Sequence, residues 1–163
     1  MASAHDLRLA GAVLAVALTA VLVWLGTGMH PWWPAIWFAP LPVLVYAAGA
    51  AWWRAAIAAA IAWLVGMLSC WHYLHDVLRT PGAFVAQFYG GEALAFTLGA
   101  LLYRALLRRG AYGWSVIAFP AVRVAFEYLL AIGGPHGTAG SLAYTQVEFL
   151  PVLQLASITG RGG

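Results

Sequence analysis

The sequence has very few charged residues. Only 8% of its 163 residues are charged, against roughly 25% in an average soluble domain, and 64% are apolar. This composition excludes an ordinary soluble domain and indicates a membrane protein. The chain also has a single cysteine, Cys70, which excludes an intrachain disulfide framework and any metal site built from cysteines alone.

Soluble segments are lacking as well. There is no long polar linker and no internal repeat, so residues 1–163 are predicted to form a single membrane domain. The formal net charge is +3, but the basic residues are scattered among the ends of apolar runs. Because no soluble block could carry a basic footprint, we expect no nucleic-acid partner.

What the sequence does contain is long apolar runs. A transmembrane helix needs about 20 apolar residues, and we predict spans at about residues 9–26, 35–53, 55–75, 83–107 and 111–132. A last run, 151–160, is too short to cross a bilayer. We therefore expect an outer segment over 133–150 and then a partial helix over 151–160. The predicted fold class is all-α: a polytopic bundle of transmembrane helices with five spans and a truncated sixth.

The arginines predict the orientation of these spans. If the N-terminus is cytoplasmic, five arginines fall in inner segments and only Arg79 falls in an outer one. The positive-inside rule favours this arrangement. The five inner residues are Arg8, Arg54, Arg104, Arg108 and Arg109.

Small residues recur at four-residue spacing within the predicted spans. Such stripes let helix backbones approach each other closely, so we expect helix-packing seams there. They include Ala58, Ala62 and Gly66, and Gly91, Ala95 and Gly99.

Three ionisable residues, Glu92, Arg123 and Glu127, lie inside predicted spans. An ionisable side chain at the bilayer centre costs roughly 2.5 to 3.5 kcal/mol, so these residues must face protein or water. Arg123 and Glu127 are spaced i,i+4 and can pair along one helix face. Two interpretations stay open: an internal ion pair that orients helices, or the polar wall of a cavity that admits a lipid headgroup.

A cluster in "CWHYLHD" contains His72, His75 and Asp76 on one helix face. This spacing can bind a transition metal, but side chains at a membrane–water boundary can equally be solvated, and we expect no metal and no cofactor. Cys70 precedes this cluster in an apolar run, without a nearby group that would activate its thiol. We predict that it is a small core residue.

Four stretches of the sequence resemble one protein family. The stretches are "WFAPLPVLVY" (37–46), "WHYLHDVLRTP" (71–81), "FPAVRVAFEYLL" (119–130) and "GSLAYTQVEFLPVLQLASITGRGG" (140–163). They resemble stretches of the apolipoprotein N-acyltransferases. The first is similar to the second span of that family, the second to a "WxYxxLHDxGGxP" segment, the third to a "PALWxxxEWLR" run, and the fourth to a "GYSQ" turn with a "PLLQLAxxxGxxG" helix start. Leu78 and Arg79 stand where the "WxYxxLHDxGGxP" pattern has its two glycines.

The resemblance implies a bacterial inner-membrane protein related to acyl transfer. The family moves an acyl chain from a phospholipid to the N-terminal cysteine of a lipoprotein, through a thioester on an enzyme cysteine. The implied partners are therefore the phospholipid bilayer and a lipoprotein substrate or a separate catalytic chain. In the family the cysteine, its glutamate base and an oxyanion-stabilising lysine belong to a later, nitrilase-like domain. That domain is not within these residues and the sequence has no lysine, so we expect a membrane domain that is not catalytic by itself.

Six candidate site residues are expected to line a cavity or the outer face. The resemblance implies Glu127, Tyr144, Gln146, His75 and Asp76, and the i,i+4 pairing with Glu127 adds Arg123. Arg123 has no counterpart in the family, so the resemblance implies that Glu127→Ala disturbs the protein more than Arg123→Ala. Two other functions stay open. One is a non-enzymatic membrane scaffold that binds lipid or protein; the less favoured one is a small transporter or channel subunit with its ionisable residues along a path.

Overall fold

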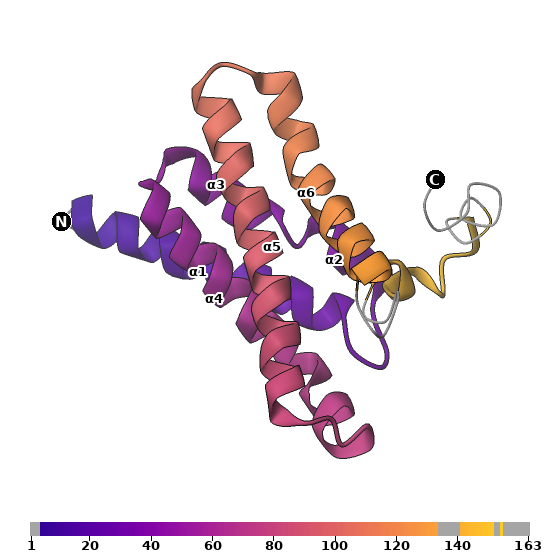
Figure 1. Ribbon diagram of the computed structural model, residues 1–163. Coiled ribbons are helices and arrows are strands. Elements are labelled where there is room, and N and C mark those ends of the chain that lie inside the picture. Colours follow the sequence, from indigo (N-terminus) through magenta and orange to yellow (C-terminus); the bar gives the residue numbers. More distant parts are fainter. Residues whose placement is uncertain (1–3, 134–140, 152–153, 155–163) are drawn as a thin grey trace.

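The computed structural model describes residues 4–133, 141–151 and 154 (Figure 1). These residues form helices and turns, with no strand among them. The elements are, in chain order, α1 (Ala4–Gly26), α2 (Trp33–Phe38), α3 (Leu41–Gly49), α4 (Trp52–Met67), the 3₁₀ turn η1 (Leu68–Cys70), the π-helical turn η2 (Tyr73–Val77), α5 (Gly82–Arg108), α6 (Tyr112–Gly133) and the 3₁₀ turn η3 (Leu142–Gln146).

Four helices are long and apolar enough to cross a membrane. They are α1, α4 together with η1, α5 and α6. Large apolar side chains cover their outer surfaces, among them Val13, Ile57, Leu94 and Val124. A soluble monomer rarely exposes so much contiguous apolar surface, whereas lipid tails solvate it without cost. The predicted all-α bundle of transmembrane helices is confirmed.

The second predicted span, 35–53, differs from the structure. The segment runs over 33–49 and consists of two short helices, α2 and α3. Pro40 and Pro42 have no N–H, so two backbone hydrogen bonds are missing at the point where α2 ends and α3 begins. Ala51 is extended and α4 begins directly after it, so Trp52 and Trp53 belong to the next helix.

The last predicted elements lie only partly within the described residues. Of the outer segment 133–150, residues 134–140 fall outside, while 141–149 form η3 and the turns that follow it. Most of the predicted partial helix 151–160 also lies outside the described residues.

Helix α5 lies at the centre of the bundle, between α4 and α6 (Figure 1). A tight turn at the top of Figure 1 connects α5 to α6, and it contains Gly110 in the left-handed conformation (φ 78°). The connection from α4 to α5, which contains η2, lies at the opposite end. Helix α1 packs along α4, while α3 contacts α1, α4 and α5.

Glycine allows the closest helix contacts. A Cβ atom at Gly66 of α4 would lie 2.5 Å from Val23 Cβ and 2.9 Å from the carbonyl oxygen of Ala20, both in α1. A Cβ at Gly99 of α5 would lie 2.9 Å from Phe119 Cδ2 in α6. The small-residue stripes thus form packing seams, as their spacing predicts.

Candidate functional site

Three charged side chains from two helices meet inside the bundle. Arg123 Nη1 lies 2.9 Å from Glu92 Oε2, and Arg123 Nη2 lies 3.3 Å from Glu127 Oε1. The exposed fractions of the side chains are 6% for Arg123, 3% for Glu92 and 25% for Glu127. We call this group the Arg123 network. It joins α5, which carries Glu92, to α6, which carries the other two residues.

Aromatic rings surround the guanidinium of Arg123. Its Cζ lies 5.0 Å from the centre of the Trp63 ring and 5.9 Å from that of Phe126. Trp63 in turn stacks on Phe96 at 4.6 Å. Cation–π contact with tryptophan stabilises a desolvated cation, so α4 also supports the network through Trp63.

The hydrogen bonding of Arg123 is incomplete. Its contact with Glu92 has ion-pair distance but not the angle of a directed hydrogen bond, and its Nε has no acceptor among the described residues. Charge attraction and contact with the aromatic rings therefore contribute more to holding the guanidinium than its incomplete set of hydrogen bonds does.

Glu127 connects the network to the segment 141–149. The Ser141 hydroxyl donates to Glu127 Oε2 at 2.6 Å, and the Leu142 N–H donates to Glu127 Oε1 at 3.2 Å. The Ser141 oxygen also accepts from the Ala143 N–H at 3.2 Å and so caps the start of η3. One carboxylate thus binds both Arg123 and the beginning of the segment 141–149.

The other end of this segment binds α2. The Trp37 indole N–H donates to Gln146 Oε1 at 2.9 Å, and Gln146 Nε2 donates to the carbonyl oxygen of Trp33 at 3.4 Å. Phe149 stacks on Trp33 with the ring centres 4.1 Å apart. Gln146 is buried by these contacts, whereas Tyr144 between the two ends is exposed. The segment 141–149 therefore bridges from α6 to α2.

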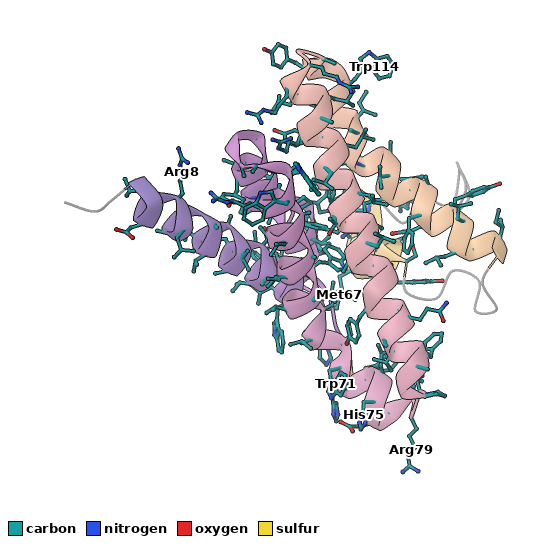
Figure 2. The ribbon with its side chains drawn as sticks, turned by 60° about the vertical axis from the view of Figure 1, so that its left-hand side comes forward. Arg8, Met67, Trp71, His75, Arg79 and Trp114 are labelled. Carbon is teal, nitrogen blue, oxygen red and sulfur yellow. The ribbon has the colours of Figure 1, made fainter. Side chains whose placement is uncertain are left out.

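His75 and Asp76 lie elsewhere, in η2 between α4 and α5. His75 Nδ1 lies 2.7 Å from Asp76 Oδ1, and His72 Nδ1 lies 2.8 Å from Asp76 Oδ2. Figure 2 shows His75 and Arg79 at the end of the molecule opposite Trp114. The hydrogen bonds from His75 and then from His72 lower the pKa of Asp76 below its ordinary value.

The backbone of this connection is strained at Arg79. Its φ of 49° lies in the left-handed region, which glycine adopts freely and an arginine does not. Arg79 is one of the two positions where the family pattern that this segment resembles has glycine, the residue that adopts this conformation freely.

Two cavities lie on other parts of the surface. One, of about 360 Å³, lies beside the α1–α2 connection and is lined in part by Thr27, His30, Ser69 and His72. The second, of about 570 Å³, lies between α1 and α4. None of the six candidate site residues lines either cavity.

The structure thus brings four of the candidate residues into one assembly and separates the other two. Arg123 and Glu127 pair, and the segment bound by Glu127 contains Tyr144 and Gln146, while His75 and Asp76 form their own exposed cluster. The candidate set omitted Glu92, although its position inside a span is a signal. It also omitted Ser141 and Trp37, although both lie in stretches that resemble the family.

The chemistry available to these groups is limited. Cys70 Sγ has Ser69 Oγ at 3.7 Å, and no described histidine or carboxylate bonds to it as a base. In the described part of the chain, no group of three or more His, Cys, Asp or Glu side chains is arranged to hold a metal ion. The Arg123 network can fix helices and the segment 141–149, and it can present charge to a ligand.

Comparison with known proteins identifies the family. The family model described as the apolipoprotein N-acyltransferase N-terminal domain matches residues 11–163 of the sequence. Neither the curated proteins nor the solved structures gave a match. With its apolar helices, the chain is a multi-pass membrane protein, and it belongs to the apolipoprotein N-acyltransferase N-terminal domain family.

Proposed function

We propose that this chain provides the membrane domain for acyl transfer from a phospholipid to the N-terminal cysteine of lipoproteins, without itself carrying the catalytic nucleophile. The observation that carries this proposal is the family match over residues 11–163. In this proposal the domain lies in the bacterial inner membrane with its N-terminus in the cytoplasm. The five arginines at the predicted inner ends of the spans support that orientation.

The Arg123 network has a supporting role in this proposal. Glu127 and Arg123 hold the segment 141–149 across the outer end of the bundle, and the exposed Tyr144 belongs to the face that meets substrate. The buried position of Arg123 favours the ion pair that orients helices over the wall of a lipid cavity. Glu127, which is less buried and bonds the outer segment, is the member of the network nearest to that face.

Cys70 is not the nucleophile in this proposal. A reactive thiol needs a base or a cation that stabilises the thiolate, whereas the Cys70 thiol contacts the hydroxyl of Ser69. The acyl chemistry then belongs to groups outside this domain, either in the same protein or in a separate catalytic chain.

The purified chain, incubated with phospholipid radiolabelled in its acyl chains, tests this division of labour. We expect no hydroxylamine-sensitive label on the protein, and the same result for Cys70→Ser. Strong labelling of the wild type that disappears in Cys70→Ser would show that the chain is itself an acyl-enzyme and would overturn the proposal.

If the catalytic groups lie in a separate chain, the two chains should form a complex. We expect a nitrilase-like protein to co-purify from native membranes and to be lost when Ser141→Ala and Gln146→Ala together release the segment 141–149. Co-purification that is unchanged in this double variant would place the partner on another face. Recovery of the chain alone in every mild detergent would argue instead for a scaffold that acts without such a partner.

A further inference from the structure

A groove runs along the surface between α1 and α4, apart from the Arg123 network. Its volume is about 570 Å³. The residues that line it are Arg8, Leu9, Ala12, Val13, Val16, Ala17 and Ala20 of α1, Tyr46 of α3, and Trp53, Arg54, Ile57, Ala58, Ile61 and Val65 of α4.

The groove has the length of one lipid leaflet. On α1 it extends from Arg8 to Ala20, which at 1.5 Å per residue corresponds to about 18 Å. Half of a hydrocarbon core of about 30 Å is about 15 Å. Small side chains such as Ala17 and Ala58 form part of the lining, while Val13 and Ile57 are exposed at its sides. An acyl chain that lies along the groove would contact apolar atoms for the depth of a leaflet.

The mouth of the groove is basic. Arg8 and Arg54 line it near the starts of α1 and α4, and Figure 2 shows Arg8 projecting from the beginning of α1. Arg54 Cζ lies 4.9 Å from the ring centre of Trp53, which also lines the groove. Among the described residues no carboxylate forms an ion pair with either arginine, and no acidic residue lines the groove.

We propose that this groove binds one anionic phospholipid, with the phosphate between Arg8 and Arg54 and one acyl chain between α1 and α4. Guanidinium groups bind phosphate oxygens in pairs of hydrogen bonds, so both arginines at this mouth can attract one phosphate. The lipid belongs to the leaflet on the side where α1 begins. With the N-terminus in the cytoplasm this is the inner leaflet, across the membrane from the face where the proposed acyl transfer takes place.

Native mass spectrometry of the delipidated, detergent-solubilised chain tests the site. Phosphatidylglycerol and phosphatidylcholine with identical acyl chains serve as the two probes. We expect one molecule of phosphatidylglycerol to be retained at about tenfold lower concentration than phosphatidylcholine, and Arg8→Gln/Arg54→Gln to remove this preference. Arg108→Gln/Arg109→Gln is the matched control, because it removes two arginines at the other inner connection and should leave the preference unchanged.

A second variant tests the acyl-chain part of the groove. Ala17 is exposed and lines the groove, so Ala17→Trp fills the space without entering the core. We expect it to weaken retention of both lipids while leaving the unfolding temperature unchanged.

Three results would overturn the proposal. They are equal retention of the two lipids by the wild type, an equal loss of preference in the Arg108/Arg109 control, and a lipid-independent dimer that Ala17→Trp abolishes. The last result would show that a second copy of the chain occupies the groove.

Discussion

The α5–α6 interface and the α1–α4 interface join helices by different means. The first holds three charged residues, of which Arg123 and Glu92 are buried and Glu127 is partly exposed, with aromatic rings around the arginine. The second brings two backbones together over small residues and leaves an apolar groove outside. In a bilayer, apolar side chains gain little by leaving lipid for protein, so close packing and polar contacts must hold helices together. The α1–α4 interface relies on close packing, whereas the α5–α6 interface adds the charged network to close contacts such as that of Gly99 with Phe119. Only the α5–α6 interface is bonded, through Glu127, to the segment 141–149.

Arg123→Ala should cause the largest loss of stability. It leaves Glu92 buried without its cation, and removing one partner of a buried ion pair typically costs about 3–5 kcal/mol. Unfolding in mixed micelles of SDS and mild detergent measures the loss. Glu127→Ala should cost less, because Glu127 is more exposed and Glu92 still neutralises Arg123.

This order is the opposite of the one that the family resemblance implies, in which Glu127 matters more. Arg109→Ala, at an exposed position at the end of α5, is the control and should leave stability unchanged. If Glu127→Ala destabilises the protein more than Arg123→Ala does, the network is not centred on the arginine and the contrast between the interfaces weakens.

Gly66→Ala tests the other interface. The added Cβ would lie within 3 Å of both Val23 and the Ala20 backbone, so α1 and α4 must separate, at a typical cost of about 1–3 kcal/mol. The same unfolding assay measures this cost. Gly90→Ala is the matched control, because Gly90 lies in α5 with nothing within 4 Å of the added atom, and there alanine should be neutral or stabilise the protein by up to about 1 kcal/mol. Equal effects of the two substitutions would argue against close packing at this interface.

The two interfaces also differ in how far the sequence predicts them. The Gly66 seam follows from spacing alone, because small residues four apart face one side of a helix. The pairing of Arg123 with Glu127 follows in the same way from i,i+4 spacing within α6. The contact with Glu92 does not, since it depends on the register of α5 against α6, which packing such as that of Phe119 on Phe96 determines.

Other features needed the structure for similar reasons. The run 35–53 contains no charge, and hydropathy therefore favoured one span, but Pro40 and Pro42 divide it. Gln146 was identified by resemblance, while its partner Trp37 is more than 100 residues away in sequence, and no local pattern indicates the contact.

Ser141→Ala should have a smaller and more local effect. It removes one hydrogen bond to the Glu127 carboxylate, but the Leu142 N–H and Arg123 still bind it, so we expect a loss of about 1 kcal/mol. Hydrogen exchange should become faster over 141–149 and stay unchanged in α1 and α4. Glu148→Gln, an exposed change in the same segment, is the control. Faster exchange throughout the bundle would show that the outer segment stabilises both interfaces.

The smallest expected effect concerns the exposed charged cluster of η2, the solvated counterpart of the Arg123 network. Hydrogen bonds from His75 and His72 lower the pKa of Asp76, so the folded state favours the ionised carboxylate. The contribution of the ionised carboxylate to folding stability is fully present above the ordinary carboxyl pKa of about 3.9. It is lost as the pH falls through the lower pKa that Asp76 has in the folded state. Because Asp76 is solvent-exposed, the unfolding midpoint should hardly change at neutral pH in Asp76→Asn. Carboxyl ¹³C NMR should show a depressed titration midpoint for Asp76, which His75→Ala raises more than His72→Ala does. Asp76→Asn could instead destabilise the protein as much as Arg123→Ala does. That result would show that burial is not the reason why the Arg123 network contributes more to stability than the exposed cluster around Asp76.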